Sequence, residues 1–334
     1  MTVPQQPTRW SKEIIESVKN LGLITGDASA NKTRERFAVG GTDLGIPIMH
    51  NDTLYLFLGD TFLGDDMGNP MQGGAWRSNV AAKVTDLNFQ QGMIIEDMIT
   101  TENGRYAIEL ISSEKIPGTE HTVIPTGGIS VNDALYVYFM SVRSWGEPGQ
   151  WDINYGGLAK SVDGETFEKV DIALDGNSFG QVAVIREDDT LYGIGIGGGR
   201  FGGAHLFRVP VDSIEDLGSY KYYTGDRYAE DVRLATEIVE DPVGEPSVFF
   251  NKHLNSYVLT YLNEHKRAIV MRTAKELEGP WSDESIVVHA DDYPALYGGF
   301  THEVMTSKDG KTFYLTLSMW DPIYNVLLFE VNLH

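Results

Sequence analysis

Five tyrosines in this chain stand in the same local sequence context, and this repeat restricts the fold more than any other feature. Each lies in an aromatic and β-branched run that follows an apolar run and a short polar turn, the pattern of a β-hairpin. They are Tyr55, Tyr136, Tyr192, Tyr257 and Tyr314. Successive tyrosines are 81, 56, 65 and 57 residues apart, close to the ~40–50 residue period of propeller blades when longer loops are allowed. The repeat therefore predicts an all-β, five-bladed propeller in which residues at equal offsets from each tyrosine occupy equivalent places around one axis.

The first four repeats each supply four strand candidates of ordinary length. These blades are expected over about residues 36–95, 121–172, 178–225 and 243–290. The intervening segments 96–120 and 226–241 fit no blade strand and are expected to be loops.

The last repeat, residues 298–334, supplies only three strand candidates, at 301–307, 312–319 and 325–333. We expect the apolar stretch 21–25 to provide the missing outer strand, so that strands from both chain ends close the ring and remove its exposed edges. Apolar and charged residues alternate with helical spacing over 11–20, which predicts a short amphipathic helix. Residues 1–35 would then hold this helix and the closing strand, and residues 1–334 would form one domain.

The charge of the chain excludes some partners. Its 334 residues carry 48 acidic and 26 basic side chains, a formal net charge of −22, and the acids are scattered. Binding to nucleic acid needs a basic track, and anionic membranes repel such a surface, so we expect neither as a partner. An uncharged polysaccharide or oligosaccharide is compatible with this charge.

Several chemistries find no support in the residue pattern. The chain has no cysteine, which excludes disulfides and thiolate metal sites. Its histidines lack the spacing of a metal site, so we expect no cofactor and no catalytic metal; a structural calcium ion is compatible with the acids but no ligand spacing requires it. No run of about 18 apolar residues occurs, and Met1–Gln6 lacks the regions of a signal peptide. Localisation therefore stays open: secreted or at the cell surface if a leader has been removed.

The tyrosine repeat also locates candidate catalytic residues. The positions twelve residues before each tyrosine are Asp43, Ile124, Gly180, Glu245 and His302. They should begin the inner strands, which run side by side along the central channel and converge at one mouth. Acids and a histidine at one opening are the groups needed for general acid and base catalysis.

Hairpin register pairs Asp43 with a second acid. If Asn51 and Asp52 form a two-residue turn, Asp43 lies opposite Asp60. Opposed residues place their Cβ atoms ~4.5–5.5 Å apart, and repulsion between two carboxylates separates their pKa values. A slip of one residue would turn Asp60 to the other face of the sheet.

Paired carboxylates are typical of glycosidases. A separation of ~5–5.5 Å favours retention of the anomeric configuration and ~6.5–9.5 Å favours inversion. Asp43 with Asp60 would favour retention, whereas Asp43 working with Glu245 across the channel would favour inversion, and the sequence leaves both open.

Aromatic and polar side chains near predicted strand ends are candidates for sugar binding, because sugars offer flat apolar faces and hydroxyl groups. Together with His302 they are Trp76, Arg77, Asn79, Trp151, Asn154, Gln181, Tyr297 and Trp320.

Residues 40–62, GGTDLGIPIMHNDTLYLFLGDTF, resemble the domain of unknown function 4185, which is linked to glycoside hydrolase family 183. The resemblance continues through GEPSVFFNKHLNSYVLTY at 244–261 and LYGGFTHEVM at 296–305, and it covers most of residues 36–334. It implies a five-bladed propeller and endo-acting hydrolysis of D-arabinofuranose linkages. The acidic pair of the family would fall on Asp43, as base or nucleophile, and on Asp60, as acid.

Two other functions remain open at this point. A sialidase-like glycosidase would need an arginine cluster for a carboxylated sugar, and only Arg77 and Arg200 are placed to contribute. A non-catalytic propeller that binds glycans or proteins would need no carboxylate pair.

Overall fold

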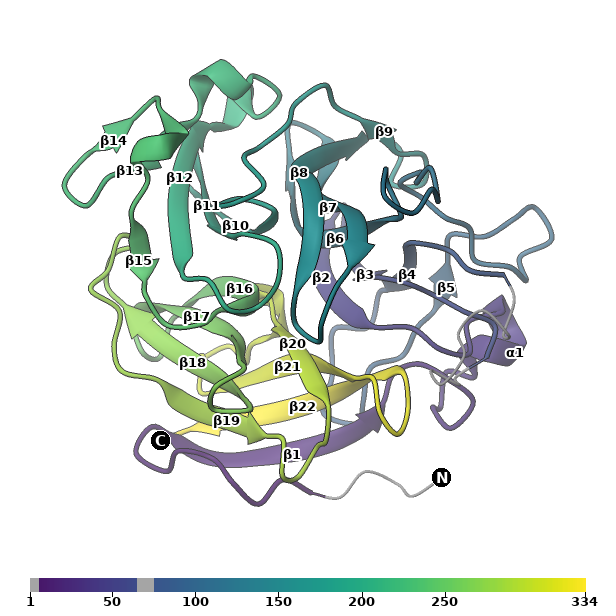
Figure 1. The fold of residues 1–334 in the computed structure, drawn as a ribbon. Coiled ribbons are helices and arrows are strands. Elements are labelled where there is room, and N and C mark those ends of the chain that lie inside the picture. The colour runs from purple at the N-terminus through teal and green to yellow at the C-terminus, as the bar shows by residue number, and fades with distance from the viewer. Residues whose placement is uncertain (1–5, 65–74) are drawn as a thin grey trace.

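The computed structural model describes residues 6–64 and 75–334, and in them five antiparallel sheets form a ring (Figure 1). This confirms the prediction of an all-β, five-bladed propeller. Blade one contains β2 (Leu44–His50), β3 (Thr53–Leu58), β4 (Val80–Val84) and β5 (Asp97–Met98). Blade two contains β6 (Thr122–Val131), β7 (Ala134–Trp145), β8 (Trp151–Ser161) and β9 (Glu168–Lys169).

Blade three is enlarged by short outer strands. It contains β10 (Gln181–Glu187), β11 (Thr190–Ile196), β12 (Ala204–Pro210), β13 (Lys221–Tyr223), β14 (Tyr228–Ala229) and β15 (Glu237–Val239). Because β15 pairs with β12, the expectation that residues 226–241 lie outside the blades is wrong. The expectation that residues 96–120 fit no blade strand is also wrong at their start, because β5 is the outer strand of blade one, which was expected to end at about residue 95. The rest of this segment is irregular apart from isolated bridges.

The last two blades complete the ring. Blade four contains β16 (Gly244–Asn251), β17 (Ser256–Asn263), β18 (Ala268–Ala274) and β19 (Ser285–His289). Blade five contains β20 (Leu296–Phe300), β21 (Thr312–Met319), β22 (Asn325–Leu333) and β1 (Ile15–Leu23). The described residues also form α1 (Thr33–Phe37) and the 3-10 turns η2 (Val211–Ser213), η3 (Leu217–Ser219), η4 (Val232–Leu234) and η5 (Glu303–Met305).

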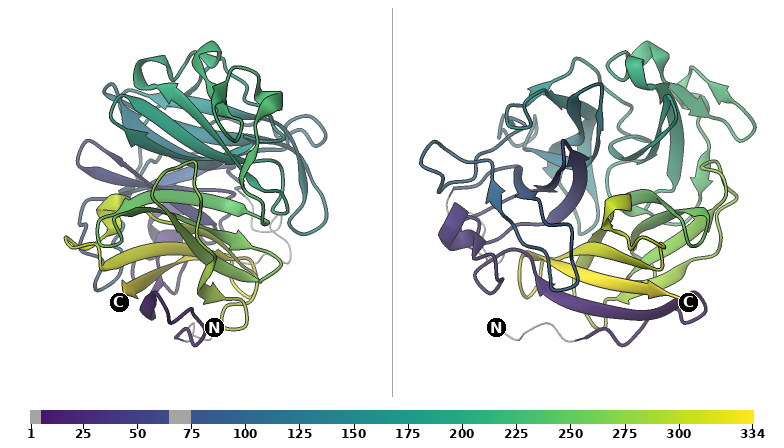
Figure 2. Two further views of the ribbon diagram at one scale, coloured as in Figure 1. Left: turned by 90° about the vertical axis from the view of Figure 1, so that its left-hand side faces the viewer. Right: turned by 180° about the vertical axis from the view of Figure 1, so that it is seen from behind.

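The N-terminal strand closes the ring as expected, but from an earlier position. In Figures 1 and 2, β1 lies beside the C-terminal strand β22, and the two pair antiparallel. The helix predicted over residues 11–20 is therefore wrong. The helical spacing of Ile15 and Val18 arises because a bulge at Glu16 adds one residue to the strand, so that both side chains point to the same core face, where Leu333 and Val331 oppose them.

The five repeat tyrosines stand on the second strand of their blades. In the first four blades each faces an apolar residue of the inner strand, as in the pairs Ile48–Tyr55 and Phe250–Tyr257. In blade five the inner strand is β20 rather than the expected 301–307. Phe300, the last residue of β20, pairs with Thr316 of β21. The chain then forms the turn η5, so no residue of β20 lies opposite Tyr314. Residues at offset twelve therefore lie at or near the start of the inner strand in four blades and not in the fifth.

Apolar side chains from neighbouring blades form the cores between the sheets. For example, Tyr138 of blade two packs with Phe207 of blade three, and Phe249 of blade four packs with Phe313 of blade five. This packing fixes the first residues of the inner strands around one end of the ring. Over residues 6–64 and 75–334, we find no helix with the length and apolar character needed to span a membrane.

Candidate active site

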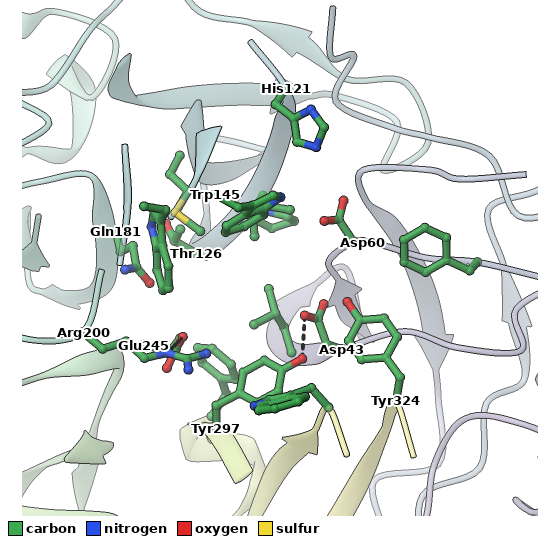
Figure 3. Close-up of a pocket in the computed structure, with 18 of the residues that line it drawn as sticks. Asp43, Asp60, His121, Thr126, Trp145, Gln181, Arg200, Glu245, Tyr297 and Tyr324 are labelled. Atoms are coloured by element: carbon green, nitrogen blue, oxygen red, sulfur yellow. Dashed lines mark hydrogen bonds and ion pairs between the residues drawn. The ribbon is translucent and has the colours of Figure 1, made fainter. Parts of the chain in front are cut away.

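A cavity of about 600 Å³ opens where the inner strands begin, within the usual size of small-molecule sites (Figure 3). The three acids predicted to be catalytic, Asp43, Asp60 and Glu245, all line it. Aromatic side chains make up much of the remaining wall: Phe62, Trp76, Trp145, Trp151, Tyr297, Phe300, Trp320 and Tyr324.

A bulge at the start of β2 sets the position of Asp43. Leu44 and Gly45 have φ values of 67° and 87°, and the register of β2 against β3 shifts between Leu44 and Ile46. The carbonyl of Asp43 consequently accepts a hydrogen bond from the amide of Gly59, at 3.2 Å. The predicted direct opposition of Asp43 and Asp60 is wrong by one residue, so the register no longer supports retention of configuration.

Asp60 nevertheless faces the same cavity as Asp43. It lies beyond Leu58, the last residue of β3, so the alternation of the strand does not determine its direction. Figure 3 shows both carboxyl groups at the cavity wall, on the same side of the site. The shift in register therefore does not turn Asp60 to the opposite face of the sheet.

A tyrosine hydroxyl holds the carboxyl of Asp43. The hydroxyl of Tyr297 donates to Oδ2 at 2.8 Å, while Oδ1 is buried with no hydrogen-bond partner among the described residues. The pKa of Asp43 is raised to about 7, mainly by burial and also by the nearby charges of Asp60 and Glu245, while the hydroxyls of Tyr297 and Tyr324 oppose part of the shift. Although the cavity gives this side chain some access to solvent, protein surrounds it on its other sides, and desolvation remains the largest cause.

Asp60 is held by two donors on a single oxygen. The indole Nε1 of Trp76 and the hydroxyl of Thr122 both donate to Oδ1, each at 2.8 Å. Burial is the main reason that the pKa of Asp60 is raised to about 6, and these two hydrogen bonds and the charge of Lys115 oppose part of the shift. Lys115 also fixes Trp76, because its ammonium lies 4.0 Å from the centre of the indole ring and forms an ion pair with Glu109 at 2.7 Å.

Glu245 forms the opposite wall together with Arg200. Arg200 Nε donates to Oε1 of Glu245 at 2.7 Å, and its Nη1 is 3.2 Å from Oε1 of Glu264. The guanidinium also lies 4.8 Å from the ring centre of Tyr297. Glu245 has a left-handed φ of 44° at a register shift of β16, and its buried Oε2 has no partner among the described residues. The arrangement leaves one buried glutamate oxygen at the cavity wall without a hydrogen-bond partner.

The structure brings five of the nine predicted sugar-binding residues to this cavity: Trp76, Trp151, Gln181, Tyr297 and Trp320. His302 is not among them. It lines a separate hollow with Ile48 and Met49, at the far ends of the inner strands, because β20 stops at Phe300 and η5 follows. Its prediction as a residue of the same mouth is therefore wrong.

Three more residues that were predicted to bind sugar form hydrogen bonds within the protein instead. Arg77 is buried and donates to the carbonyls of Ala38 and Ala107. Asn79 is buried and joins the loop at Leu110–Ile111 to Val123 through four hydrogen bonds. Asn154 bonds to Arg143, Thr119 and Ser141. None of the three is part of the cavity lining.

Sequence reasoning missed several residues of the wall, among them His121, Trp145 and Tyr324. His121 directly precedes β6, so its place before an inner strand was a usable signal. Its buried Nδ1 lacks a partner among the described residues, and burial together with Lys115 lowers its pKa. Trp145 ends β7 and Tyr324 lies between β21 and β22, where no repeat pattern applies. Arg200, which the sequence suggested only for a sialidase, lies in an irregular loop.

In the part of the chain that the structure describes, no group of three or more His, Cys, Asp or Glu side chains is arranged to hold a metal ion. The described side chains of the cavity that can bind a ligand or transfer a proton are the three carboxyl groups, the aromatic rings, His121, Gln181 and Arg200.

Comparison with known families and relatives gives matches that cover most of the chain. The model of the family described as domain of unknown function (DUF4185) matches residues 28–330. Notoamide biosynthesis cluster protein J of Aspergillus sp. (strain MF297-2) is 30% identical over 87% of this chain and 82% of its own length. Notoamide biosynthesis cluster protein J' of Aspergillus versicolor is 29% identical over 93% of this chain and 88% of its own.

Solved structures share the fold at low sequence identity. A protein of Bacteroides ovatus has a TM-score of 0.69 and 13% identity, over 98% of this chain and 93% of its own. A GH43_1 enzyme of Xanthomonas citri has a TM-score of 0.53 and 13% identity, over 88% and 87%. An exo-β-1,3-galactanase of Phanerochaete chrysosporium has a TM-score of 0.55 and 12% identity, over 93% of this chain and 63% of its own. The structural neighbours thus include propeller glycoside hydrolases.

Proposed function

Because the chain belongs to the family of the domain of unknown function DUF4185, we propose that it is a glycoside hydrolase that cleaves furanoside linkages in a polysaccharide. The specific reaction we propose is endo-acting hydrolysis of D-arabinan, which the resemblance to glycoside hydrolase family 183 implies. The glycoside hydrolases among its structural neighbours are compatible with this proposal through the fold they share.

One observation carries the proposal: two carboxyl groups with raised pKa values face one aromatic cavity. The pKa values of Asp43 and Asp60 are about 7 and about 6, and the charge of Asp60 contributes to the shift of Asp43. The pair therefore holds about one proton near neutral pH, and its titration belongs to both residues. A carboxylic acid and a carboxylate side by side are the two groups that glycoside hydrolysis uses.

The reaction would proceed through both groups. The protonated carboxyl donates its proton to the leaving glycosidic oxygen as the bond to the anomeric carbon breaks. The ionised carboxylate attacks that carbon or takes a proton from an attacking water. We propose the order of roles that the family resemblance implies, with Asp60 as the acid and Asp43 as base or nucleophile. The pKa of Asp43 is the higher of the two, so this order uses the minor form of the singly protonated pair, in which Asp60 holds the proton.

The remaining wall would bind and orient the sugar. Glu245 is fixed by Arg200 and has a free oxygen to accept a hydrogen bond from a sugar hydroxyl. Trp151 presents a buried Nε1 that has no partner among the described residues, which is a donor for another hydroxyl. The rings of Trp76, Trp145 and Trp320 provide flat apolar faces. A neutral sugar satisfies these groups without adding a charge to an acidic site.

A sialidase-like reaction is less well supported. Of the described residues that line the cavity, the arginine is Arg200, and it is already paired with Glu245 and Glu264. Arg77, the other arginine that the sequence suggested, is buried outside the lining.

A non-catalytic binding propeller is the second candidate function. The relatives are named as biosynthesis cluster proteins rather than hydrolases, and aromatic walls also suit a flat apolar molecule. Such a binder would retain its ligand when Asp43 is replaced, because it would not use the carboxylate pair chemically.

Incubation with a panel of D-arabinan, fructan and sialoside substrates, followed by product chromatography, tests the proposal. We expect oligosaccharide products from D-arabinan and none from the sialosides. Products from no member of the panel, together with binding of a ligand in the cavity, would favour the non-catalytic function.

A further inference from the structure

A second hollow of about 470 Å³ lies next to the catalytic cavity. It is bounded by the turn at residues 146–150, which joins β7 to β8, and by the loop at 198–202, which follows β11. Trp151 belongs to the lining of both spaces. A chain molecule that occupies the cavity and passes over Trp151 therefore continues into this hollow.

Exposed aromatic rings mark the route between the two spaces. Trp145 in the cavity lining and Phe201 in the lining of the hollow are each 45% exposed. Trp145 packs edge to face against Trp151, with ring centres 5.6 Å apart. Large aromatic side chains gathered at one exposed place are typical of a binding surface. Trp145 lines the cavity, Phe201 lines the hollow, and Trp151 lines both.

Polar groups that suit sugar hydroxyls accompany these rings. The carboxylates of Glu147 and Asp152 are exposed at the hollow. The indole Nε1 of Trp151, at the boundary of the two spaces, is buried and lacks a hydrogen-bond partner among the described residues. A buried donor without an acceptor is unfavourable, and a ligand oxygen at this boundary would accept its hydrogen bond.

Backbone hydrogen bonds fix the walls of the hollow. The amide of Arg200 donates to the carbonyl of Gly149 at 2.9 Å, and the amide of Gln150 donates to the carbonyl of Glu147 at 2.8 Å. The space is therefore a fixed feature of the fold, and the side chain of Arg200 connects it to Glu245 in the cavity.

We propose that this hollow is a second sugar-binding subsite, which holds a neighbouring residue of the same uncharged polysaccharide whose scissile bond lies at Asp43 and Asp60. This inference rests on the proposed glycosidase function and makes it more specific. The substrate is a chain that extends past Trp151 toward Phe201, so longer oligosaccharides are better substrates than short ones.

Two substitutions test the subsite in opposite ways. Phe201→Ala removes a stacking face. Gly202→Leu fills the hollow, and a Cβ at Gly202 meets no atom within 4 Å and requires no left-handed φ, so the fold accommodates it. Leu234→Ala is the matched control, since Leu234 is 52% exposed and lies outside both spaces.

The measurement is kcat/KM for reducing-end-labelled D-arabinofuranose oligosaccharides of two and of six residues. We expect the wild type to prefer the longer substrate, and we expect Phe201→Ala and Gly202→Leu to reduce that preference about tenfold, or about 1.4 kcal/mol. The Leu234→Ala protein should keep the wild-type ratio. An unchanged ratio in both subsite variants, or an equal loss on both substrates, would overturn the subsite.

Calorimetric binding of the same oligosaccharides to the Asp43→Asn protein separates this inference from the proposed function. If the wild type hydrolyses nothing, the catalytic proposal fails, yet a higher affinity for the longer chain that is lost when Phe201→Ala is added supports the subsite. Equal affinity for both lengths, or no binding of either, refutes it.

Discussion

The hydroxyl of Tyr297, on the inner strand of blade five, donates a hydrogen bond of 2.8 Å to Oδ2 of Asp43, which precedes the inner strand of blade one. This bond joins the last blade to the first at the candidate catalytic carboxyl. It also stabilises the ionised form of Asp43, which counteracts part of the rise in pKa that burial produces.

Tyr297→Phe removes that donor and keeps the ring. We expect the pKa of Asp43 to rise further, because the charged form loses a hydrogen bond, and kcat/KM to fall about tenfold at neutral pH. The pH dependence of kcat/KM measures both effects. A lower rate with no movement of the pH profile would show that Tyr297 acts on the substrate rather than on the charge of Asp43.

The carboxyl pair predicts a narrow pH optimum. Since the pair needs one proton, kcat/KM should follow a bell with limbs near the two raised pKa values, about 6 and about 7. A pH–rate profile on D-arabinan oligosaccharides checks this. A plateau that extends down to pH 4 would contradict the raised pKa values.

Coupling between the two acids can be observed directly. In Asp60→Asn the repulsive charge beside Asp43 is absent, so the pKa of Asp43 should fall below its wild-type value. Titration of carbon-13-labelled aspartate side chains by NMR reports this shift. An unmoved titration of Asp43 would show that the charge of Asp60 does not contribute to its pKa.

Asp43 should also make the protein less stable as the pH rises. The pKa in the folded state, about 7, exceeds the ordinary value of 3.8, so the folded protein binds the proton more tightly than the unfolded chain. The resulting contribution to stability is complete below pH 3.8 and is lost as the pH rises to 7. Thermal unfolding should show Asp43→Asn more stable than the wild type at pH 8, by about 1–3 kcal/mol, and little different at pH 4. A variant that is less stable at pH 8 would contradict the sign.

Gly59 provides the space for the carboxyl of Asp43. A Cβ at this position would lie 2.3 Å from Oδ1 of Asp43, so Gly59→Ala should move that carboxyl. Misplacement of a catalytic group by about 1 Å costs about 10²-fold in rate. We expect a loss of kcat of this size with the fold retained by circular dichroism. Wild-type kcat would show that the position of Asp43 is not critical.

How far the sequence predicts the site depends on how regular each blade is. The tyrosine repeat predicts the fold, and it finds Asp43 and Glu245 because in those blades the inner strand runs directly opposite the tyrosine. It fails for His302 because β20 ends earlier and a turn replaces the rest of the strand. A prediction from simple hairpin register also misses the bulge at Leu44–Gly45, because the bulge depends on the local backbone conformation of these two residues.

Polar residues near strand ends were the least reliable predictions. Arg77 and Asn79 have polar side chains that suit a sugar-binding wall. In the structure they instead form hydrogen bonds with backbone carbonyls and amides of loops. The long segment 96–120 that provides many of these partners has no periodic pattern. In the same way, Arg200 and Trp145 reach the site through loops or strand ends whose course depends on tertiary packing.

The central claim is that Asp43 and Asp60 catalyse hydrolysis, and the release of oligosaccharides from D-arabinan tests it most directly. Wild type, Asp43→Asn, Asp60→Asn and the control Asp171→Asn, which replaces an exposed aspartate, are compared by chromatography of the products over time. We predict release by the wild type and the control, and a loss of about 10³-fold in both cavity variants. Release at the wild-type rate by Asp43→Asn would contradict this claim.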